Sequence, residues 1–207
     1  MRITGGNARG IPLCLPARGE IRPATDFLRG AVFSSLGGLV SGARVLDAFA
    51  GTGAYGLEAL SRGAGSVCFI EKNPAAIAAI RANTVAVLKA CQTPRVPGLG
   101  VSPPPPPLVL TADALAWEWR DGDATGAGTG FDLIFCDPPW ALWTSVAGPL
   151  IAKLVSWADK SGGVVPSIVL EAPGGWTPPV PSGWQLHRHL SRGRNQPAAS
   201  ILRPSTA

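Results

Sequence analysis

The segment from Leu46 to Gly56 constrains the fold of this chain more than any other part of the sequence. It reads LDAFAGTGAYG, an apolar strand that enters a G-x-G-x-x-G turn and continues into a helical pattern. Glycines at this spacing permit a tight turn and a close approach of the backbone to a ligand. Glu71 stands twenty residues after Gly51, at the end of the next apolar run, where an acid accepts hydrogen bonds from a ribose diol. The spacing predicts a binding site for an adenine nucleoside.

Short apolar runs bounded by turn residues alternate with helical patterns along the chain. The runs cover 44–50, 66–71, 108–111, 131–136 and 167–171, and the helical patterns cover 54–62, 74–91 and 142–160. Continuous apolar runs of this length are typical of strands buried on both faces of a parallel sheet. The alternation predicts an α/β fold with right-handed crossovers. Two last runs, 184–190 and 198–202, predict an antiparallel hairpin.

Residues 1–40 and 92–107 fall outside this alternation. The first segment predicts a small hairpin followed by a helix that Thr25 caps, ahead of a main domain at 41–207. The second contains five consecutive prolines, 103–107, which favour polyproline II and indicate an exposed insertion. Such a segment fits a docking site for a proline-binding partner or a tolerated loop, and the tolerated loop is the commoner case.

The basic residues concentrate at the two ends of the 207-residue chain. Residues 1–30 hold five arginines against two acids, and residues 185–207 hold four arginines and no acid, whereas residues 31–184 hold nine bases against eleven acids. Basic ends on a near-neutral body indicate either a polyanionic partner or an ordinary solvated surface.

Cysteine and histidine usage gives no sign of a metal site. The four cysteines (14, 68, 91 and 136) form no C-x-x-C pair, and the chain has only two histidines. We therefore expect reduced, structural thiols. No apolar run reaches the roughly 18 residues of a membrane span, and the N-terminus lacks a secretory signal pattern. We expect a soluble, cytoplasmic monomer that does not bind membranes.

Two further acids bear on the nature of the nucleoside. Asp47 stands at the strand end four residues before Gly51, where its carboxylate can face the ammonium of a bound amino acid moiety. A dinucleotide has no such cation, and its pyrophosphate would be repelled, so Asp47 favours S-adenosylmethionine over NAD. Asp113 follows the third run and is placed either for the adenine amino group or as a helix cap.

The motif Asp137-Pro138-Pro139-Trp140 comes directly after the fourth run. The two prolines make the exit from the strand rigid, at the sheet edge where open α/β folds bind ligands. We expect the Asp137 carboxylate and the Pro138 carbonyl to accept both N–H groups of an exocyclic amine, while the base stacks on Trp140. Such hydrogen bonds pull the amine towards tetrahedral geometry and free its lone pair to attack a methyl group.

With these motifs the chain resembles the bacterial 16S ribosomal RNA guanine-N2 methyltransferases. The resemblance rests on Arg2–Gly6 with Arg9-Gly10, Arg22–Asp26, Leu46–Ala64 (above all Gly56–Ala64), Ile70–Asn73, Asp113 and Asp137–Trp140. It implies a Rossmann-like class I methyltransferase with a mostly parallel seven-stranded sheet, a C-terminal antiparallel hairpin and an N-terminal RNA-contacting extension. The sequence departs from the family pattern at Phe27, where an Arg is usual, at Gly30, where a Glu is usual, around Arg192-Gly193 and in the proline insertion.

The combined reading assigns residues to three tasks. The candidates for binding S-adenosylmethionine are Asp47, Phe49, Gly51, Thr52, Gly53, Glu71, Lys72, Asp113 and Ala114. The candidates for holding the target guanine are Asp137, Pro138, Pro139 and Trp140. The candidates for gripping RNA phosphates are Arg2, Arg9, Arg22, Arg29, Arg188, Arg192 and Arg194.

The expected activity is methylation of the N2 amine of a guanine in 16S rRNA, within the small ribosomal subunit or an assembly intermediate. Two alternatives stay open: adenine-N6 methylation of DNA or RNA, which the same D-P-P-aromatic motif serves, and a non-catalytic rRNA-binding assembly factor. An NAD-dependent oxidoreductase is less favoured, because no His or Tyr after the fourth run is placed to assist hydride transfer.

Overall fold

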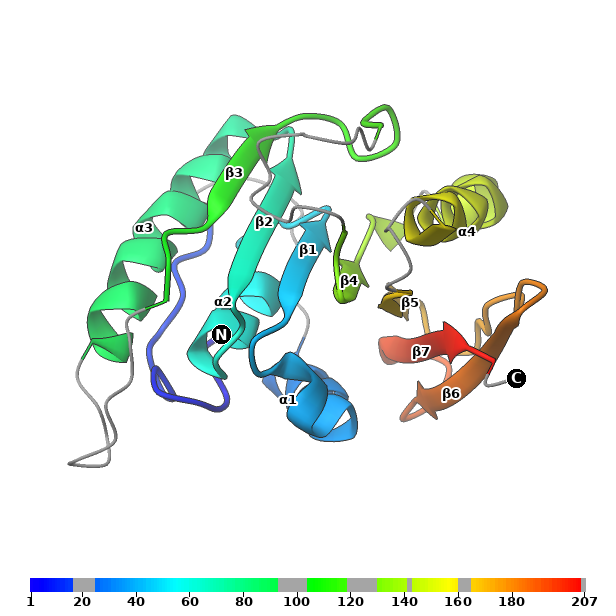
Figure 1. The fold of residues 1–207 in the computed structure, drawn as a ribbon, viewed down its shortest axis with the longest axis horizontal. Helices are drawn as coiled ribbons and strands as arrows, with labels where there is room; N and C mark the ends of the chain where they lie inside the picture. The colour runs from blue at the N-terminus through cyan, green and yellow to red at the C-terminus, as the bar shows by residue number, and fades with distance from the viewer. Residues whose placement is uncertain (17–24, 93–103, 119–129, 141–142, 160–164, 206–207) are drawn as a thin grey trace.

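A seven-stranded sheet with the strand order β3-β2-β1-β4-β5-β7-β6 forms the centre of the molecule (Figure 1). The computed structural model describes residues 1–207 except 17–24, 93–103, 119–129, 141–142, 160–164 and 206–207. The strands are β1 Arg44–Ala48, β2 Ser66–Glu71, β3 Leu108–Thr111, β4 Leu133–Cys136, β5 Ser167–Ala172, β6 Trp184–Leu190 and β7 Ala198–Pro204. The strands β1 to β5 pair in parallel, and β7 runs antiparallel to both β5 and β6. The predicted parallel sheet and C-terminal hairpin are confirmed.

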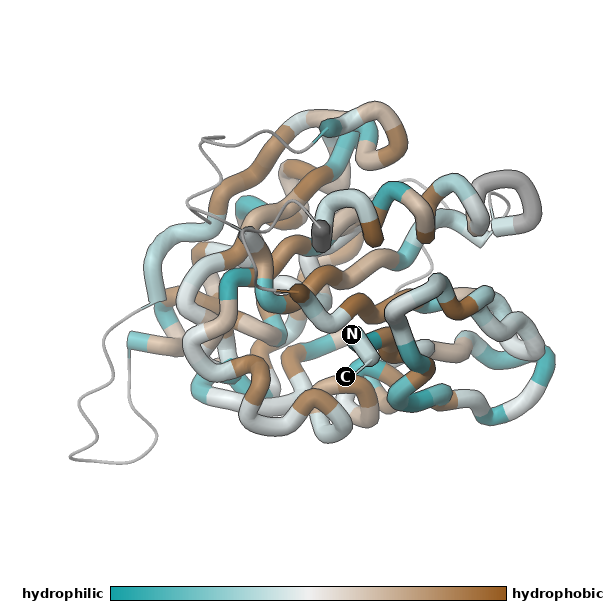
Figure 2. Tube along the Cα trace, turned by 45° about the vertical axis from the view of Figure 1, so that its right-hand side comes forward, coloured by the Kyte–Doolittle hydropathy of each residue, from teal (hydrophilic) through white to brown (hydrophobic). Residues whose placement is uncertain are grey.

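Helices cover both faces of this sheet. They are α1 Asp26–Leu36, a 3-10 turn at Gly37–Val40, α2 Ala54–Ser61, α3 Pro74–Cys91 and α4 Trp143–Asp159. The first three helices share one buried cluster with the odd-numbered positions of the central strands, such as Val45 and Phe135. Helix α4 shares the other cluster with the even-numbered positions, such as Leu46 and Ile134. Figure 2 shows the hydrophobic colour following the central strands between these layers.

Local residue chemistry sets where the elements begin and end. The Thr25 hydroxyl accepts from the Leu28 amide at 3.2 Å and starts α1, as predicted, and the Asn73 side chain caps α3 ahead of Pro74. Strand β1 ends at Ala48, earlier than the predicted residue 50, because Phe49 adopts a left-handed φ of 64°. Strand β4 starts at Leu133 rather than 131, after Asp132 has turned its carboxylate to the Arg44 amide.

Helix α3 is the one helix among the described residues that is long and apolar enough, by length and composition, to cross a membrane. In this structure its buried residues, among them Ile80 and Val87, belong to the core cluster beside the sheet. Its exposed positions include Arg81 and Lys89. The helix is thus accounted for as a core helix of an α/β domain.

The buried carboxylate of Glu58 on α2 joins the N-terminal segment to the rest of the fold. It accepts from the Thr4 amide and the Thr4 hydroxyl, both at 2.7 Å, from Arg29 Nε at 3.3 Å and from Arg62 Nε at 2.9 Å. The side chains of Arg29 and Glu58 are both fully buried. A buried ion pair is tolerated only when hydrogen bonds satisfy the remaining acceptor sites of the carboxylate. The four hydrogen bonds to Glu58 meet this condition.

The predicted N-terminal hairpin is reduced to a single antiparallel bridge between Arg2 and Pro12. Ile3, Leu13 and Val32 lie in the same buried cluster as the sheet. The division predicted at residues 40 and 41 therefore does not separate two hydrophobic cores.

Replacing Glu58 by Gln is expected to lower the free energy of unfolding by roughly 3 kcal/mol, because the buried Arg29 then loses the fully buried one of its two acidic partners and keeps the partly exposed Asp26. Urea unfolding followed by circular dichroism measures this loss. Glu118→Gln is the matched control, since Glu118 is 60% exposed in its ion pair with Lys153 and should cost less than about 1 kcal/mol. Equal losses for the two variants would contradict the buried role of Glu58.

Candidate active site

Four acidic side chains belong to neighbouring parallel strands at one edge of the sheet. Asp47 on β1 lies in register with Phe69 on β2 and Phe135 on β4, and Phe135 lies in register with Val169 on β5. Side chains alternate between the two faces of a sheet, so residues two positions further along stay on the same face. Glu71, Asp137 and Glu171 occupy those positions. The four carboxyl groups therefore share the carboxyl edge and the face that carries α1 and α2, where open α/β sheets bind ligands.

The turn between β1 and α2 has an unusual backbone. Phe49, Gly51 and Gly53 all have positive φ values, of 64°, 56° and 77°. For a bulky residue such as Phe49 this conformation costs on the order of 1–3 kcal/mol, and such strain concentrates at ligand sites. No larger residue fits at Gly56 without a shift of Phe69, since an added Cβ would lie 2.3 Å from a ring carbon of Phe69. The glycine spacing thus serves both the turn and the packing of α2 on β2.

Two side chains hold this turn in place. The Glu71 carboxylate accepts from the Gly51 amide at 2.8 Å, and from the amides of Lys72 and Asn73 at the same distance. The Asn83 side-chain amide donates to the Thr52 carbonyl at 3.1 Å. Since a carboxylate offers about four acceptor sites, Glu71 keeps only about one for the predicted ribose contact.

Asn83 was not predicted as a site residue. It is 1% exposed on α3 and also exchanges hydrogen bonds with the backbone of Cys14, accepting from its amide at 2.7 Å and donating to its carbonyl at 3.1 Å. The only sequence signal for it was a polar residue among the apolar positions of the Ala-rich helix.

Asp47 is a buried carboxyl that receives one hydrogen bond. It is 2% exposed and accepts from the Gly56 amide at 2.9 Å. Burial raises the pKa of Asp47 to about 8, the charge of Glu71 raises it as well, and the Gly56 hydrogen bond only partly opposes this. A carboxyl with this pKa ionises readily near neutral pH only when a cation approaches it, which fits the predicted ammonium-binding role.

Asp113 has one of the two roles that the sequence left open, that of a cap, and its contact with the adenine amine stays a prediction. Its carboxylate pairs with Lys72 Nζ at 2.8 Å and accepts from the Leu115 amide at 3.0 Å, so it caps the turn that begins at Ala114. These hydrogen bonds, that of Lys72 first, lower the pKa of Asp113 and keep it ionised. Asp113 and Lys72 are both solvent-accessible, and Ala114 is buried. The pair lies just past β2 and β3, on the same sheet edge as Glu71.

The Asp137-Pro138-Pro139-Trp140 motif follows β4 as predicted. Asp137 is half-buried and makes no hydrogen bond within the described part of the chain. Burial raises the pKa of Asp137 well above its ordinary value, and the charges of Glu171 and Asp47 add to the rise. Pro138 is buried, Pro139 is exposed, and Trp140 lies half-buried against the core cluster of α4. The motif thus presents, at the edge of the sheet, a carboxyl group that no described residue hydrogen-bonds.

Glu171 and Tyr55 were missed by the sequence reasoning. Glu171 ends the fifth run as Asp137 ends the fourth, and that parallel was the available signal. It is 3% exposed and accepts from the Tyr55 hydroxyl at 2.7 Å. The Tyr55 ring stacks on Phe135 with centroids 4.9 Å apart. Burial raises the pKa of Glu171 to about 7, while the Tyr55 hydrogen bond and the charge of Arg29 work against the rise.

The basic residues divide into exposed and buried members. Five of the predicted RNA-binding residues are exposed, namely Arg2, Arg9, Arg188, Arg192 and Arg194. Arg29 is fully buried, bound to Glu58 and to Asp26 at 2.9 Å, so the predicted phosphate contact by Arg29 is wrong. Sequence could not distinguish it, because burial depends on the fold around α1. Arg22 lies outside the described residues.

The two basic ends of the chain meet at the start of α1. The Arg192 guanidinium lies 3.6 Å from the centre of the exposed Phe27 ring, and Arg2 pairs with Asp26 at 3.7 Å. The loop that carries Arg192 and Arg194 enters β7 at Ala198, which pairs with Ala172 at the end of β5. The loop therefore lies at the same edge of the sheet as Asp137 and Glu171.

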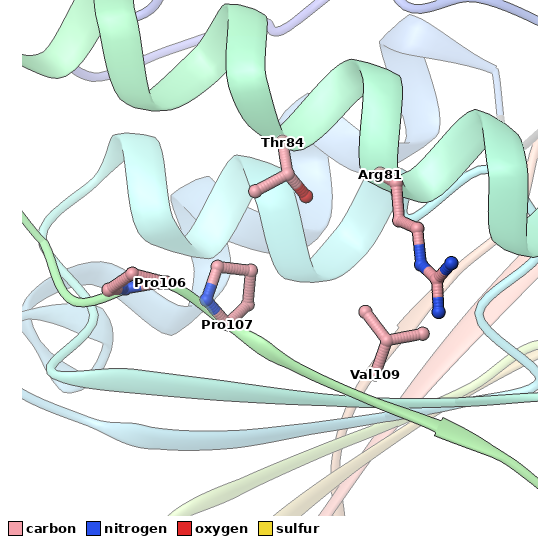
Figure 3. Close-up of a pocket in the computed structure, with 5 residues that line it drawn as sticks. All are labelled: Arg81, Thr84, Pro106, Pro107 and Val109. Carbon is pink, nitrogen blue, oxygen red and sulfur yellow. The ribbon is translucent and has the colours of Figure 1, made fainter.

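A separate hollow of about 310 Å³ lies between α3 and the start of β3. Figure 3 shows Arg81 and Thr84 on α3 and Val109 on β3 lining it, together with Pro106 and Pro107. None of the predicted site residues lines this hollow, which is near the opposite end of β3 from Asp113. Among the described residues, moreover, no group of three or more His, Cys, Asp or Glu side chains could hold a metal ion.

Comparisons with known proteins agree with this architecture. The family described as Conserved hypothetical protein 95 matches residues 1–96. The ribosomal RNA small subunit methyltransferase D of Escherichia coli K12 is 30% identical over 198 residues, which cover 94% of this chain and 86% of that protein. The structure of the Escherichia coli protein YhhF, described as a methyltransferase, has a TM-score of 0.73 and 28% identity, covering 100% of this chain and 99% of that one.

A structure of a protein from Thermus thermophilus also matches, with a TM-score of 0.64, 28% identity and coverage of 97% of this chain and 98% of that one. The strand order and these matches identify the fold as the Rossmann-like class I methyltransferase fold, as predicted.

Burial of Asp47 predicts a pH dependence of stability. Because the pKa of Asp47 is raised on folding, the folded chain binds more protons than the unfolded chain between about pH 4 and pH 8. The contribution of Asp47 to stability therefore falls as pH rises through this window. Asp47→Asn removes this pH dependence. The free energy of unfolding of the variant should therefore rise relative to that of the wild type by at most about 1.4 kcal/mol per pH unit as the pH increases. Urea unfolding from pH 5 to pH 8 measures the gain, and parallel curves for the two proteins would contradict it.

Proposed function

This chain belongs to the family of ribosomal RNA small subunit methyltransferase D, and we propose on that basis that it methylates the N2 amine of a guanine in 16S rRNA, using S-adenosylmethionine. The substrate is the small ribosomal subunit or an assembly intermediate in the cytoplasm, and the enzyme acts as a monomer. The observation that carries the proposal is the Asp137 carboxyl, which has no hydrogen bond from the described residues and lies near the buried carboxyl of Asp47 at the carboxyl edge of the sheet.

The residues around the glycine turn suit S-adenosylmethionine. In this proposal the Asp47 carboxyl ionises as the ammonium of the cofactor approaches it, Glu71 accepts from a ribose hydroxyl, and the solvent-accessible Asp113 accepts from the adenine amine. The strained turn at Phe49, Gly51, Thr52 and Gly53 gives the backbone a close approach to the ligand. When bound, the cofactor supplies an electrophilic methyl group on a sulfonium.

Asp137 and its neighbours would then orient the target amine. The carboxylate and the Pro138 carbonyl accept the two N–H groups of the guanine amine, and the Trp140 ring stacks on the base. Rigid positioning of the nucleophile lowers the entropic part of the barrier. The proline pair and the packing of Trp140 on the core restrict how far these acceptors can move.

A labelling experiment tests this proposal. The protein is incubated with methyl-tritiated S-adenosylmethionine and 30S subunits from cells that lack the enzyme, and the RNA is digested to nucleosides. Label is expected in N2-methylguanosine. Label in N6-methyladenosine would instead favour the adenine alternative, and RNA binding without cofactor binding would favour the assembly factor.

Two variants accompany the labelling. Asp137→Ala should lower transfer by about 10³-fold while leaving the cofactor affinity within a few-fold, because it removes an acceptor for the amine and no cofactor ligand. Asp132→Ala removes an acid at the other end of β4, where it pairs with Arg44 at 2.8 Å, and should keep its transfer rate once folded. A fully active Asp137→Ala variant would refute the assigned role.

The exposed arginines of the C-terminal hairpin are expected to bind phosphates. A triple Ala variant of Arg188, Arg192 and Arg194 should weaken binding to an rRNA fragment and reduce the slope of log K against log salt by about one for each phosphate that is no longer neutralised. Filter binding at several salt concentrations measures the slope. Arg81→Ala, which removes an exposed base on α3, is the control and should leave the slope unchanged. An unchanged slope in the triple variant would rule out this RNA-binding surface.

A further inference from the structure

Asp137 and Glu171 follow directly after a pair of residues in register on adjacent parallel strands. Cys136 on β4 pairs with Leu170 on β5, so Asp137, just past the end of β4, and Glu171, still within β5, lie side by side on one face. Neither forms an ion pair of 4 Å or less with a base among the described residues. When two neighbouring carboxyl groups lie in a buried setting, the charge of one raises the pKa of the other, so the two titrations are coupled.

The surroundings of Glu171 decide which of the two carries the negative charge. The Tyr55 hydroxyl donates to a Glu171 oxygen at 2.7 Å, and the buried Arg29 on α1 favours the ionised form of Glu171 through its charge. Asp137 receives no such hydrogen bond in the described part of the chain. A carboxylate that accepts a hydrogen bond holds its charge better than one that does not. Asp137 is therefore the stronger base of the two, and its ionised form is the one that can accept a proton.

We propose that Glu171, held by the Tyr55 hydroxyl, is a positioning residue that raises the proton affinity of Asp137 so that Asp137 can take the proton released by the methylated amine. This inference rests on the proposed function, because it assigns a proton acceptor to that same reaction. Asp137 remains the catalytic residue, and Tyr55 and Glu171 act through it.

The proton balance of the reaction calls for such an acceptor. Methyl transfer forms a carbon–nitrogen bond at the amine and breaks the carbon–sulfur bond, whose electron pair stays on sulfur. The amine then holds one proton too many, and that proton passes to the Asp137 carboxylate. An ordinary aspartate is a weak base for this purpose, whereas one kept beside a second carboxylate is a stronger one. Release of the product exposes Asp137 to solvent, where the proton leaves.

The titratable and charged groups around Asp137 come from every element that packs against it. They are Asp47 on β1, Cys136 on β4, Glu171 on β5, Tyr55 on α2 and Arg29 on α1. The charge of Asp47 raises the pKa of Asp137, as the charge of Glu171 does, whereas the charge of Arg29 lowers the pKa of Glu171.

Two substitutions test the pair without removing Asp137. Tyr55→Phe keeps the ring stacked on Phe135 and removes only the hydroxyl, and Glu171→Gln removes the charge. The transfer rate should rise with pH as Asp137 ionises. In Glu171→Gln the midpoint of that rise should move to lower pH by about one unit, because a neutral neighbour no longer opposes ionisation of Asp137. In Tyr55→Phe it should move by less, because Glu171 keeps its carboxyl and loses only the hydrogen bond that stabilises its charge. If Tyr55 and Glu171 had a purely structural role, the two variants would lower the transfer rate by the same factor at every pH and the midpoint would not move. That result would overturn the proposal.

A second readout needs neither cofactor nor RNA. Carbon-13 NMR of the labelled side-chain carboxyl groups follows the titration of each acid in the protein alone. Asp137 and Glu171 should titrate together in the wild type, with Asp137 the last to ionise, and Asp137 should ionise at lower pH in both variants. Asp132→Asn, an acid-to-amide change near the opposite end of β4, is the control and should leave both titrations unchanged. Independent titration of Asp137 and Glu171 at ordinary carboxyl pKa values would overturn the pair.

The two readouts separate the failure of this inference from that of the proposed function. If 30S subunits accept no methyl group but the two carboxyls titrate as a pair, the proposed substrate is wrong and the pair stands. If N2-methylguanosine forms but neither variant moves the pH midpoint, the function stands and the role of Glu171 is refuted.

Discussion

The parallel register of β1, β2, β4 and β5 is the constraint from which the site follows. One residue of slip in any of these pairings would turn an acid from the face under α1 and α2 to the face under α4. The apolar side chains of each strand, such as Val45 and Phe135, fix the register because they must be buried in the cluster formed with α1, α2 and α3. The same packing that builds the core thus brings Asp47, Asp137 and Glu171 to one place.

Gathering carboxyl groups in this way works against folding. Asp47 and Glu171 are almost completely buried, and each has a pKa raised by that burial. The fold offsets the cost only in part, through the Gly56 amide for Asp47 and the Tyr55 hydroxyl for Glu171. Glu58, by contrast, has its buried charge matched by Arg29 and Arg62. Glu58 therefore has the partners of a structural ion pair, whereas Asp47 and Glu171 combine burial, a raised pKa and a single hydrogen bond each from the described residues, which is typical of functional sites.

The fold and the cofactor turn could be predicted from the sequence because they depend on local patterns. Apolar runs, the glycine spacing and the cap at Thr25 each involve residues close together in the chain. The burial of Arg29 could not be predicted, since its partner Glu58 lies 29 positions away on another helix. Tyr55 was read as part of the glycine motif, and its hydroxyl reaches an acid 116 positions later. Roles that depend on two distant segments required the three-dimensional structure.

Asn83 has a consequence for how the molecule responds to its ligands. One side chain holds the carbonyl of Thr52 in the cofactor turn and both backbone groups of Cys14 in the N-terminal segment. Two regions that share a single anchor are thermodynamically linked, and such linkage is reciprocal. A ligand that orders the glycine turn is therefore expected to reduce the motion of the chain around Cys14. A contact that orders the chain around Cys14 is expected, in the same way, to reduce the motion of the turn.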